Sequence, residues 1–415
     1  MDSVKVSVIV PVYKSERYLV QCLESILCQS LREIEVIIVD EGDLDRCRQI
    51  IDYYEAADPR VIAVHEKNGG YGASVNKGID RARGEYLGIV EADDFVDCEM
   101  YEGMYEHARR LAADVVRCSF AYHYSGEAPR VYELSDFITE RSPVGRTFSV
   151  RDFPAMLGTH PAIWSGLYRT EYMRGKGIRC NEAKGAGYID GVFRLDTLIN
   201  TDRVAWLPTP YYHYRRDNDL ASSALKNWNL SVSLQRWKEL HQRLEDREDL
   251  RRAIGPYIAY EEYLNTVEWL YLLNYPIKKA DLQQLEENLQ YVDEAFIKTG
   301  PLFSFQQRKI MLLAKKDIGQ FVKVAVIRNE IIRKAVWLAH RMSDLHFGRG
   351  CFACCLLSLV LSISCHLGVF LFSPGPLNAA LVHIGALAGL FSVLGFGGFL
   401  FTRSVLKVLL WLRKK

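Results

Sequence analysis

Three acidic side chains lie within four positions of one another, directly after an apolar run. Residues 84–97 read GEYLGIVEADDFVD, which places Glu91, Asp93 and Asp94 at the end of the run. A strand this apolar is buried on both faces, and side chains at its carboxyl end face the crevice where open α/β sheets bind ligands. Carboxylates suit Mg²⁺ or Mn²⁺, and such a cation suits a diphosphate. The pattern favours a cation site, with an ordinary acidic turn as the alternative.

Three earlier segments predict the sheet that carries this turn. Val4–Val12 is a β-branched run followed by a helical stretch, and Glu35–Asp40 and Val61–His65 repeat the apolar pattern. Strands separated by segments of helical period indicate an α/β fold with a doubly wound, mostly parallel sheet. The carboxyl ends of parallel strands lie at one edge of such a sheet, where ligands bind. We expect this edge to gather Tyr13, Asp40, Asn68 and Asp93.

Four motifs in order resemble those of family 2 glycosyltransferases with the GT-A fold. They are VSVIVPVY from Val6, EVIIVDEGDLD from Glu35, NGG from Asn68 followed by NKG, and ARGEY from Ala82 followed by EADD. The likeness is strong over residues 4–100 and weaker to about residue 225. The chain departs from the family at two positions. Glu41 stands where a second Asp is usual, and Glu91 replaces the first Asp of the usual Asp-x-Asp.

The resemblance implies a nucleotide site made by the first strands. Pro11 and Tyr13 would border the nucleobase, Asp40 would hold the base or the ribose, and Asn68 and Asp93 would complete the nucleotide-binding set.

The resemblance also implies a metal site, with Mn²⁺ or Mg²⁺ as the cofactor. Asp93 and Asp94 would hold the cation bound to the diphosphate. Glu91 ranks below Asp93 as a ligand, since its longer side chain can also reach a cation through water.

Sugar transfer needs a base in addition to a cation, because the acceptor hydroxyl must lose its proton. The base and the cation lie on opposite sides of the reacting carbon, so the base should come from another part of the chain. Asn181–Asp196 is a glycine-containing segment that brings Asp190 to the start of a helical stretch at residues 191–200. By resemblance, Asp190, ahead of Phe193, is the catalytic base. A helix N-cap is the simpler alternative, and the two roles are compatible.

Three further residues are weaker candidates for the acceptor or the diphosphate. Trp164 resembles an acceptor-side aromatic residue that stacks on a sugar, although a core position is equally consistent with its type. Arg215 and Arg216 follow a tyrosine-rich segment and are candidates to clamp the diphosphate.

The end of the chain is strongly apolar. Residues 351–402 contain no Asp, Glu, Lys or Arg, and Ser-Pro-Gly-Pro at 373–376 is the single break. Residues 352–372 and 377–401 are each long enough to cross about 30 Å of hydrocarbon as helices. Basic residues flank the pair and the turn is uncharged, so the positive-inside rule predicts two spans with the catalytic part in the cytoplasm. A re-entrant pair that does not fully cross is the alternative.

We therefore expect a GT-A catalytic domain at 1–225, a helical juxtamembrane module at 226–348, a transmembrane hairpin at 349–403 and a basic interfacial tail at 404–415. Between residues 308 and 349, ten Lys or Arg accompany three acids, with apolar residues at helical spacing. This pattern predicts a helix on an anionic membrane surface, or one packed on the catalytic domain. Membrane lipid is an expected partner, whereas a net charge of +1 argues against nucleic acid.

Cysteine spacing and the start of the chain bear on the compartment. No signal peptide is expected, because residue 4 already begins a predicted strand. The six cysteines of the predicted catalytic part show neither zinc-like nor redox spacing, so for a cytoplasmic chain we expect the cysteines to be reduced, mostly buried thiols.

These features predict a membrane-anchored, metal-dependent, inverting glycosyltransferase. The donor would be a nucleotide sugar, UDP-linked, and the acceptor a glycan or polyprenyl-linked hydroxyl in surface polysaccharide synthesis. A sugar-phosphate nucleotidyltransferase would need a glycine-rich basic loop after the first strand, where this chain has PVYKSER. The other alternative is a catalytically inactive nucleotide-binding membrane scaffold, which Glu41 and Glu91 would support.

Overall fold

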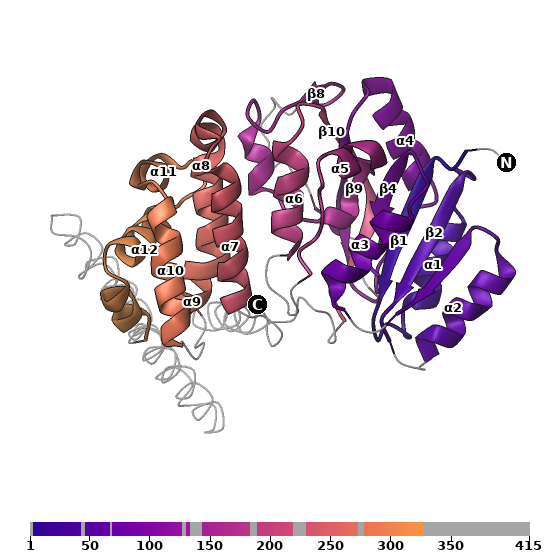
Figure 1. Ribbon diagram of the computed structural model, residues 1–415, viewed down its shortest axis with the longest axis horizontal. Coiled ribbons are helices and arrows are strands. Elements are labelled where there is room, and N and C mark those ends of the chain that lie inside the picture. The colour runs from indigo at the N-terminus through magenta and orange to yellow at the C-terminus, as the bar shows by residue number, and fades with distance from the viewer. Residues whose placement is uncertain are drawn as a thin grey trace, which may run out of the picture. The chain divides into compact units, whose positions relative to one another are not determined.

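The fold is built around one large sheet. A computed structural model describes residues 3–42, 46–66, 69–126, 130–132, 143–182, 189–218, 230–272 and 278–326. The strands are β1 (Val6–Val12), β2 (Ile34–Asp40), β3 (Val61–His65), β4 (Tyr86–Ile89), β5 (Phe95–Val96), β6 (Val115–His123), β7 (Arg130–Tyr132), β8 (Thr147–Phe148), β9 (Gly166–Arg169) and β10 (Val204–Arg215). In the sheet they follow the order β3-β2-β1-β4-β9-β6-β10-β5, with β7 beside β6 and β8 beside β10 (Figure 1).

Half of the sheet is parallel, as predicted. β3, β2, β1 and β4 are neighbours and run in the same direction. Every residue of β1 and β2 is buried, which explains why both strands are nearly continuous apolar runs. The register pairs Val12 with Asp40, and Asp40 with His65. The polar residues at the ends of these strands therefore emerge at one edge.

The other half departs from the expected, mostly parallel arrangement. β9 runs antiparallel to both β4 and β6, and β5 runs antiparallel to β10, whereas β6 and β10 are parallel. The sheet is therefore mixed. β9 is only four residues long, too short to show a strand period in the sequence.

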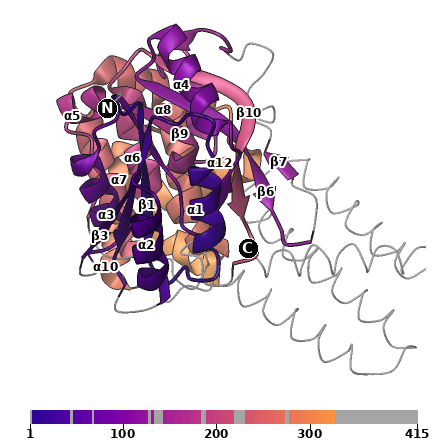
Figure 2. The same cartoon turned by 90° about the vertical axis from the view of Figure 1, so that its right-hand side faces the viewer.

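Helices cover both faces of the sheet. The helices of the described chain are α1 (Leu19–Leu27), α2 (Arg46–Ala57), α3 (Tyr71–Arg81), α4 (Met100–Leu111), α5 (Thr170–Gly175), α6 (Ile189–Ile199), α7 (Leu230–Leu244), α8 (Glu248–Glu262), α9 (Glu268–Leu272), α10 (Lys279–Tyr291), α11 (Glu294–Thr299) and α12 (Phe305–Lys316), with shorter turns η2 (Pro154–Gly158), η3 (Ile163–Ser165) and η5 (Tyr263–Val267). Figure 2 shows α1 and α3 on opposite sides of β1. α3 packs against β1 and β2, and α4 packs against β6 and β10.

The chain divides into two compact units. The first holds Met1–Asn265 and Gln290–Leu302, so α7 and α8 belong with the sheet, and the boundary expected near residue 225 falls inside this unit. α7 packs on α6, and Glu261 of α8 forms a buried ion pair with Arg194 of α6 at 3.3 Å. In the second unit, Lys315 of α12 donates a hydrogen bond from Nζ to the carbonyl of Leu289 at 2.7 Å.

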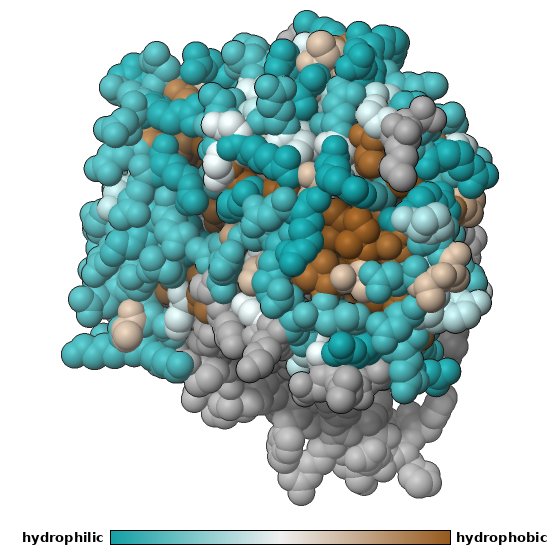
Figure 3. All heavy atoms as spheres, turned by 45° about the vertical axis from the view of Figure 1, so that its right-hand side comes forward, coloured by the Kyte–Doolittle hydropathy of each residue, from teal (hydrophilic) through white to brown (hydrophobic). Residues whose placement is uncertain are grey.

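None of the helices within the described ranges is both long and apolar enough to cross a membrane. The predicted hairpin at 349–403 and tail at 404–415 lie outside those ranges. The surface drawn in Figure 3 is largely hydrophilic and is interrupted by an apolar recess.

The expectation of reduced thiols is wrong for one pair of cysteines. Cys28 and Cys98 form a disulfide, with their Cα atoms 5.6 Å apart. The two are 70 positions apart in the sequence and meet because α1 packs against β5, a contact that cysteine spacing does not reveal. The free cysteines of the described chain are buried, as expected: Cys22, Cys47, Cys118 and Cys180.

The contact between α3 and β1 gives a prediction for stability. A Cβ atom on Gly78 would lie 2.4 Å from Cγ2 of the fully buried Ile9, so Gly78→Ala should overpack the core and lower the free energy of unfolding by about 1–3 kcal/mol. Urea unfolding followed by circular dichroism measures this.

Gly175→Ala is the matched control, because nothing lies within 4 Å of a Cβ atom there. Alanine favours the helix by up to about 1 kcal/mol, so this variant should be at least as stable as the parent. Equal stability of the two variants would contradict the tight contact at Gly78.

Candidate active site

The acidic turn and the start of α3 meet at the carboxyl edge of the parallel strands. Tyr71, the first residue of α3, donates a hydrogen bond from its hydroxyl to Oε1 of Glu91 at 2.5 Å. The backbone N–H of Glu91 donates to the hydroxyl of Tyr212 on β10 at 3.1 Å. These contacts fix both the backbone and the carboxylate of Glu91.

Glu91 lies among other carboxylates. Loss of hydration raises its pKa from 4.5 to about 8, the hydrogen bond from Tyr71 opposes the rise, and the charges of Asp93 and Asp190 add to it. Loss of hydration also raises the pKa of Asp190, while the N–H of Gly191 and the charge of Arg194 lower it. Asp190, from a distant segment of the chain, thus lies near enough to Glu91 for its charge to act on that carboxyl.

Asp94 has a different environment from its neighbours. It is 1% exposed, its Oδ2 accepts a hydrogen bond from the Tyr212 hydroxyl, and its Oδ1 accepts one from the N–H of Arg215, both at 2.7 Å. Burial and the adjacent Asp93 raise its pKa, and the two hydrogen bonds oppose the rise. Both carboxylate oxygens thus anchor the turn to β10, which leaves Glu91 and Asp93 as the carboxylates best placed for a cation.

Arg215, expected to clamp a diphosphate, braces the acidic turn from within the protein. It is 5% exposed, and its Nε donates to the carbonyl of Asp93 at 2.8 Å. Its guanidinium lies 4.4 Å from the ring centre of Tyr18, a cation–π contact. Arg216 stacks instead on Tyr214, 5.2 Å from the ring centre.

The structure adds Asn218, which sequence reasoning missed. Its Nδ2 donates to Oδ2 of Asp93 at 2.7 Å. Asn218 lies just beyond β10, and only the pairing of β10 with β5 brings that strand to the acidic turn. No signal in the sequence indicates this contact.

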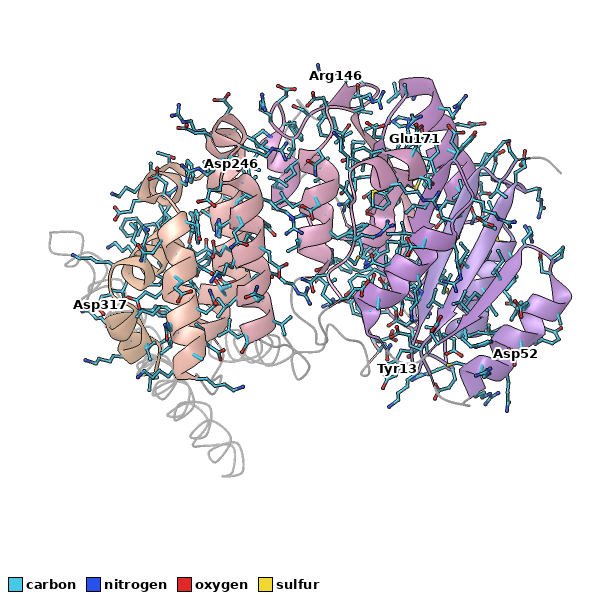
Figure 4. The ribbon with its side chains drawn as sticks, viewed as in Figure 1. Tyr13, Asp52, Arg146, Glu171, Asp246 and Asp317 are labelled. Carbon is cyan, nitrogen blue, oxygen red and sulfur yellow. A yellow bond between two sulfur atoms is a disulfide. The ribbon has the colours of Figure 1, made fainter. Side chains whose placement is uncertain are left out.

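The nucleoside side of the edge is polar and well ordered by hydrogen bonds. Asp40 is 1% exposed, and its carboxylate accepts from the N–H of Gly42 at 3.0 Å and lies 2.9 Å from Nδ1 of His65. The other ring nitrogen of His65 lies 2.9 Å from Asp52 of α2. Tyr13, 51% exposed, follows Pro11 at the end of β1, and Figure 4 shows it at the edge opposite Glu171.

Glu41, where the family pattern has Asp, holds the glycine turn before α3. Its carboxylate accepts from the N–H groups of Gly69 at 3.2 Å and Gly70 at 2.9 Å. Gly70 has a φ of 92°, which few other residues adopt. The neighbouring Asn68, predicted to bind the nucleotide, lies outside the described residues.

Asp190 occupies the first turn of α6. Its Oδ1 accepts a hydrogen bond from the N–H of Gly191 at 2.8 Å. An N-cap side chain accepts instead from the second or third residue of the helix, so this geometry differs from a standard cap. The carboxylate is near enough to raise the pKa of both Glu91 and Tyr71 by its charge.

Trp164 lies in the aromatic core. It is 6% exposed and stacks on Tyr212, with ring centres 4.2 Å apart. The ring of Phe120 meets it edge-on at 4.8 Å. Of the two interpretations of Trp164, this packing favours the core position.

The donor set fits a hard divalent cation that takes its remaining ligands from a substrate. Across the described ranges, no cluster of three or more His, Cys, Asp or Glu side chains has the geometry of a metal site. Mg²⁺ and similar ions are commonly held by one or two carboxylates plus substrate phosphates, and Glu91 and Asp93 supply such a pair.

Comparisons with known proteins agree with this geometry. Residues 7–165 match the family model described as "Glycosyl transferase family 2". The chain is 31% identical over 216 residues to the uncharacterized glycosyltransferase EpsJ of Bacillus subtilis, which covers 51% of this chain and 61% of EpsJ. It is 42% identical over 120 residues to the glycosyltransferase GlyG of Streptococcus pneumoniae, which covers 29% of this chain and 40% of GlyG. Each match covers less than two thirds of the relative's length.

Solved structures show the same fold. The crystal structure of S. aureus TarS 1–349 has a TM-score of 0.62 and 18% identity, covering 80% of this chain and 91% of TarS 1–349. The structure of TarS 1–349 in complex with UDP-GlcNAc has a TM-score of 0.62 and 20% identity, covering 80% and 92%. Residues 7–165 thus match the glycosyltransferase family 2 model, and the fold is a mixed α/β, GT-A-like one.

The raised pKa of Glu91 predicts how stability depends on pH. The folded state keeps a proton on this carboxyl that the unfolded state loses near pH 4.5, so the metal-free protein should lose stability as the pH rises from about 4.5 to about 8. Glu91→Gln cannot release that proton, and its melting temperature should fall less over this range. Thermal unfolding in chelator-containing buffers measures the slope.

Glu99→Gln serves as the control, because Glu99 is an exposed carboxyl just beyond the same turn. It should keep the pH slope of the parent. A parental slope in Glu91→Gln would mean that this carboxyl is ionised in the folded protein across the range.

Proposed function

We propose that this protein is a membrane-anchored, inverting glycosyltransferase that uses a UDP-linked sugar donor. The acceptor is a hydroxyl of a glycan or polyprenyl-linked molecule in surface polysaccharide synthesis. The observation that carries the proposal is the convergence of Glu91, Asp93 and Asp190 at the carboxyl edge of a family 2 domain. The TarS complex with UDP-GlcNAc supports a UDP-linked donor through the shared fold.

The proposed reaction is a single in-line displacement at the anomeric carbon. Asp190 accepts the proton of the acceptor hydroxyl, and its raised pKa brings this carboxylate closer to the working pH, which favours a general base. Glu91 and Asp93 are the residues to hold Mn²⁺ or Mg²⁺, which when bound supplies charge stabilisation to the departing diphosphate. Tyr71 and Asn218 orient these two carboxylates through their hydrogen bonds.

The nucleoside is proposed to lie over the ends of β1 and β2. Tyr13 offers an exposed aromatic face there, and Asp40 is oriented by its contacts with Gly42 and His65. The location at the cytoplasmic face of a membrane remains a prediction from residues 349–403. A lipid-linked acceptor would fit that location.

Replacement of the proposed base tests the function. Asp190→Asn should lower kcat for UDP release from the productive UDP-sugar by about 10²–10⁴-fold, because the acceptor or water then keeps its proton. UDP should bind this variant as it binds the parent. The assay uses the full chain in detergent with a panel of UDP-sugars, and NMR of the product anomer reports inversion.

Asp202→Asn is the matched control, since Asp202 is exposed just after α6. It should turn over like the parent. Equal rates for Asp190→Asn and the parent would remove Asp190 from the mechanism. UDP binding without turnover of any donor would favour the inactive scaffold.

A further inference from the structure

A polar pocket of about 360 Å³ lies beside the candidate active site. Its walls come from the segment between α5 and α6, from α6 itself and from the end of α7. Asp246, labelled in Figure 4, follows α7 and lies in the sequence between Arg243 and Arg247, which line the pocket. The volume falls within the range typical of small-molecule sites. We call it the α6–α7 pocket.

The charged residues that line the α6–α7 pocket are mainly cationic. Lys176, Arg179, Arg243 and Arg247 line it, and Asp196 is the one carboxylate among the lining residues. Such a set of side chains matches a negatively charged ligand better than a neutral one.

The arginines of the pocket retain hydrogen-bond donors. Arg179 pairs through Nη2 with Asp80 at 2.6 Å and donates from Nη1 to the carbonyl of Ile178 at 3.5 Å, and Arg243 pairs through Nε with Asp196 at 3.1 Å. Each guanidinium carries five N–H donors, so these contacts leave several to face a ligand. Arg247 already uses both of its terminal nitrogens, since Nη1 donates to Asn200 and Nη2 donates to the carbonyl of Ile199.

The pocket shares two structural elements with the candidate active site. Asp190 lies in the first turn of α6, and Asp196 follows six residues later, a rise of about 9 Å along the helix. Asn181 lines the pocket and contacts α3. A Cβ atom added to Gly72 of α3 would lie 2.0 Å from the carbonyl oxygen of Asn181. Gly72 adjoins Tyr71, which holds Glu91. The pocket therefore borders both α6, which carries the proposed base, and the segment that contacts α3.

We propose that the α6–α7 pocket binds an anionic group, a carboxylate or a phosphate, carried by the acceptor glycan close to its reacting hydroxyl. This inference rests on the proposed function, because it assigns the acceptor's charge. Arginine binds both kinds of anion through paired N–H donors.

Asp196 gives the pocket a characteristic response to pH. It is 7% exposed, and loss of hydration raises its pKa to about 6, while Arg243 and Arg247 oppose the rise and Glu239 adds to it. Protonation of Asp196 removes the competing negative charge and frees Arg243 for a ligand. Anion binding should therefore tighten as the pH falls through 6.

Binding of simple sugar probes tests the proposal without requiring turnover. The full chain in detergent is saturated with UDP and Mn²⁺ to occupy the donor site, and glucuronate, glucose 1-phosphate and methyl glucoside are titrated by ligand-observed NMR. The two anionic probes should bind and the neutral one should not, and the tighter anion identifies the preferred group. Arg179→Gln with Arg243→Gln should weaken anion binding at least about tenfold, with UDP binding unchanged.

Arg109→Gln is the matched control, because Arg109 is also a partly exposed arginine paired with a carboxylate, Glu85, on another surface. It should leave probe binding unchanged. Asp196→Asn should bind glucuronate with the same affinity at pH 5 and pH 7.5, unlike the parent; glucuronate is the probe here because its own charge is constant over this range.

Equal probe binding in the double arginine variant and the parent would overturn the inference, as would equal binding of the neutral and anionic sugars. If these results occur while Asp190→Asn abolishes transfer, the proposal of an anionic acceptor is rejected and the proposal of a glycosyltransferase is kept. Probe binding with the expected variant and pH effects supports the pocket even if no donor is turned over.

Discussion

The site depends on the anchoring of the acidic turn to β10. Asp94 accepts hydrogen bonds from the Tyr212 hydroxyl and from the N–H of Arg215, and Arg215 in turn binds the carbonyl of Asp93. These contacts join two segments more than one hundred residues apart and attach the turn that carries Glu91 and Asp93 to β10.

The environment of Glu91 gives the arrangement its chemical meaning. Loss of hydration raises the pKa of Glu91 to about 8, and the charges of Asp93 and Asp190 add to the rise. A divalent cation held by Glu91 and Asp93 would replace that proton and bind a diphosphate at the same time. Asp190 belongs to α6, an element separate from the acidic turn, and is the proposed base.

The sequence predicts the parts of the fold that are periodic or apolar. The parallel strands β1 to β4 and the polar edge at their ends follow from β-branched runs and from the known geometry of such sheets. Residue types indicated the acidic turn with Glu91 and Asp93, and the family resemblance indicated Asp190 as a separate candidate base. These predictions depend on local patterns or on motifs, which a single chain displays directly.

The contacts between distant segments could not be predicted in this way. β9 is too short to show a period, the Cys28–Cys98 bond requires α1 and β5 to pack together, and Asn218 reaches Asp93 only through the pairing of β10. Arg215 looked like a ligand clamp because of its charge, yet burial against Tyr18 gives it a structural role.

The most direct measurement of a cation-dependent diphosphate site at the acidic turn is calorimetric titration of the full chain with UDP, in the presence of either Mn²⁺ or a chelator. UDP should bind in the presence of Mn²⁺, and either the chelator or Asp93→Asn should weaken binding by more than about tenfold. Unchanged UDP affinity under both conditions would contradict a cation-dependent diphosphate site at the acidic turn.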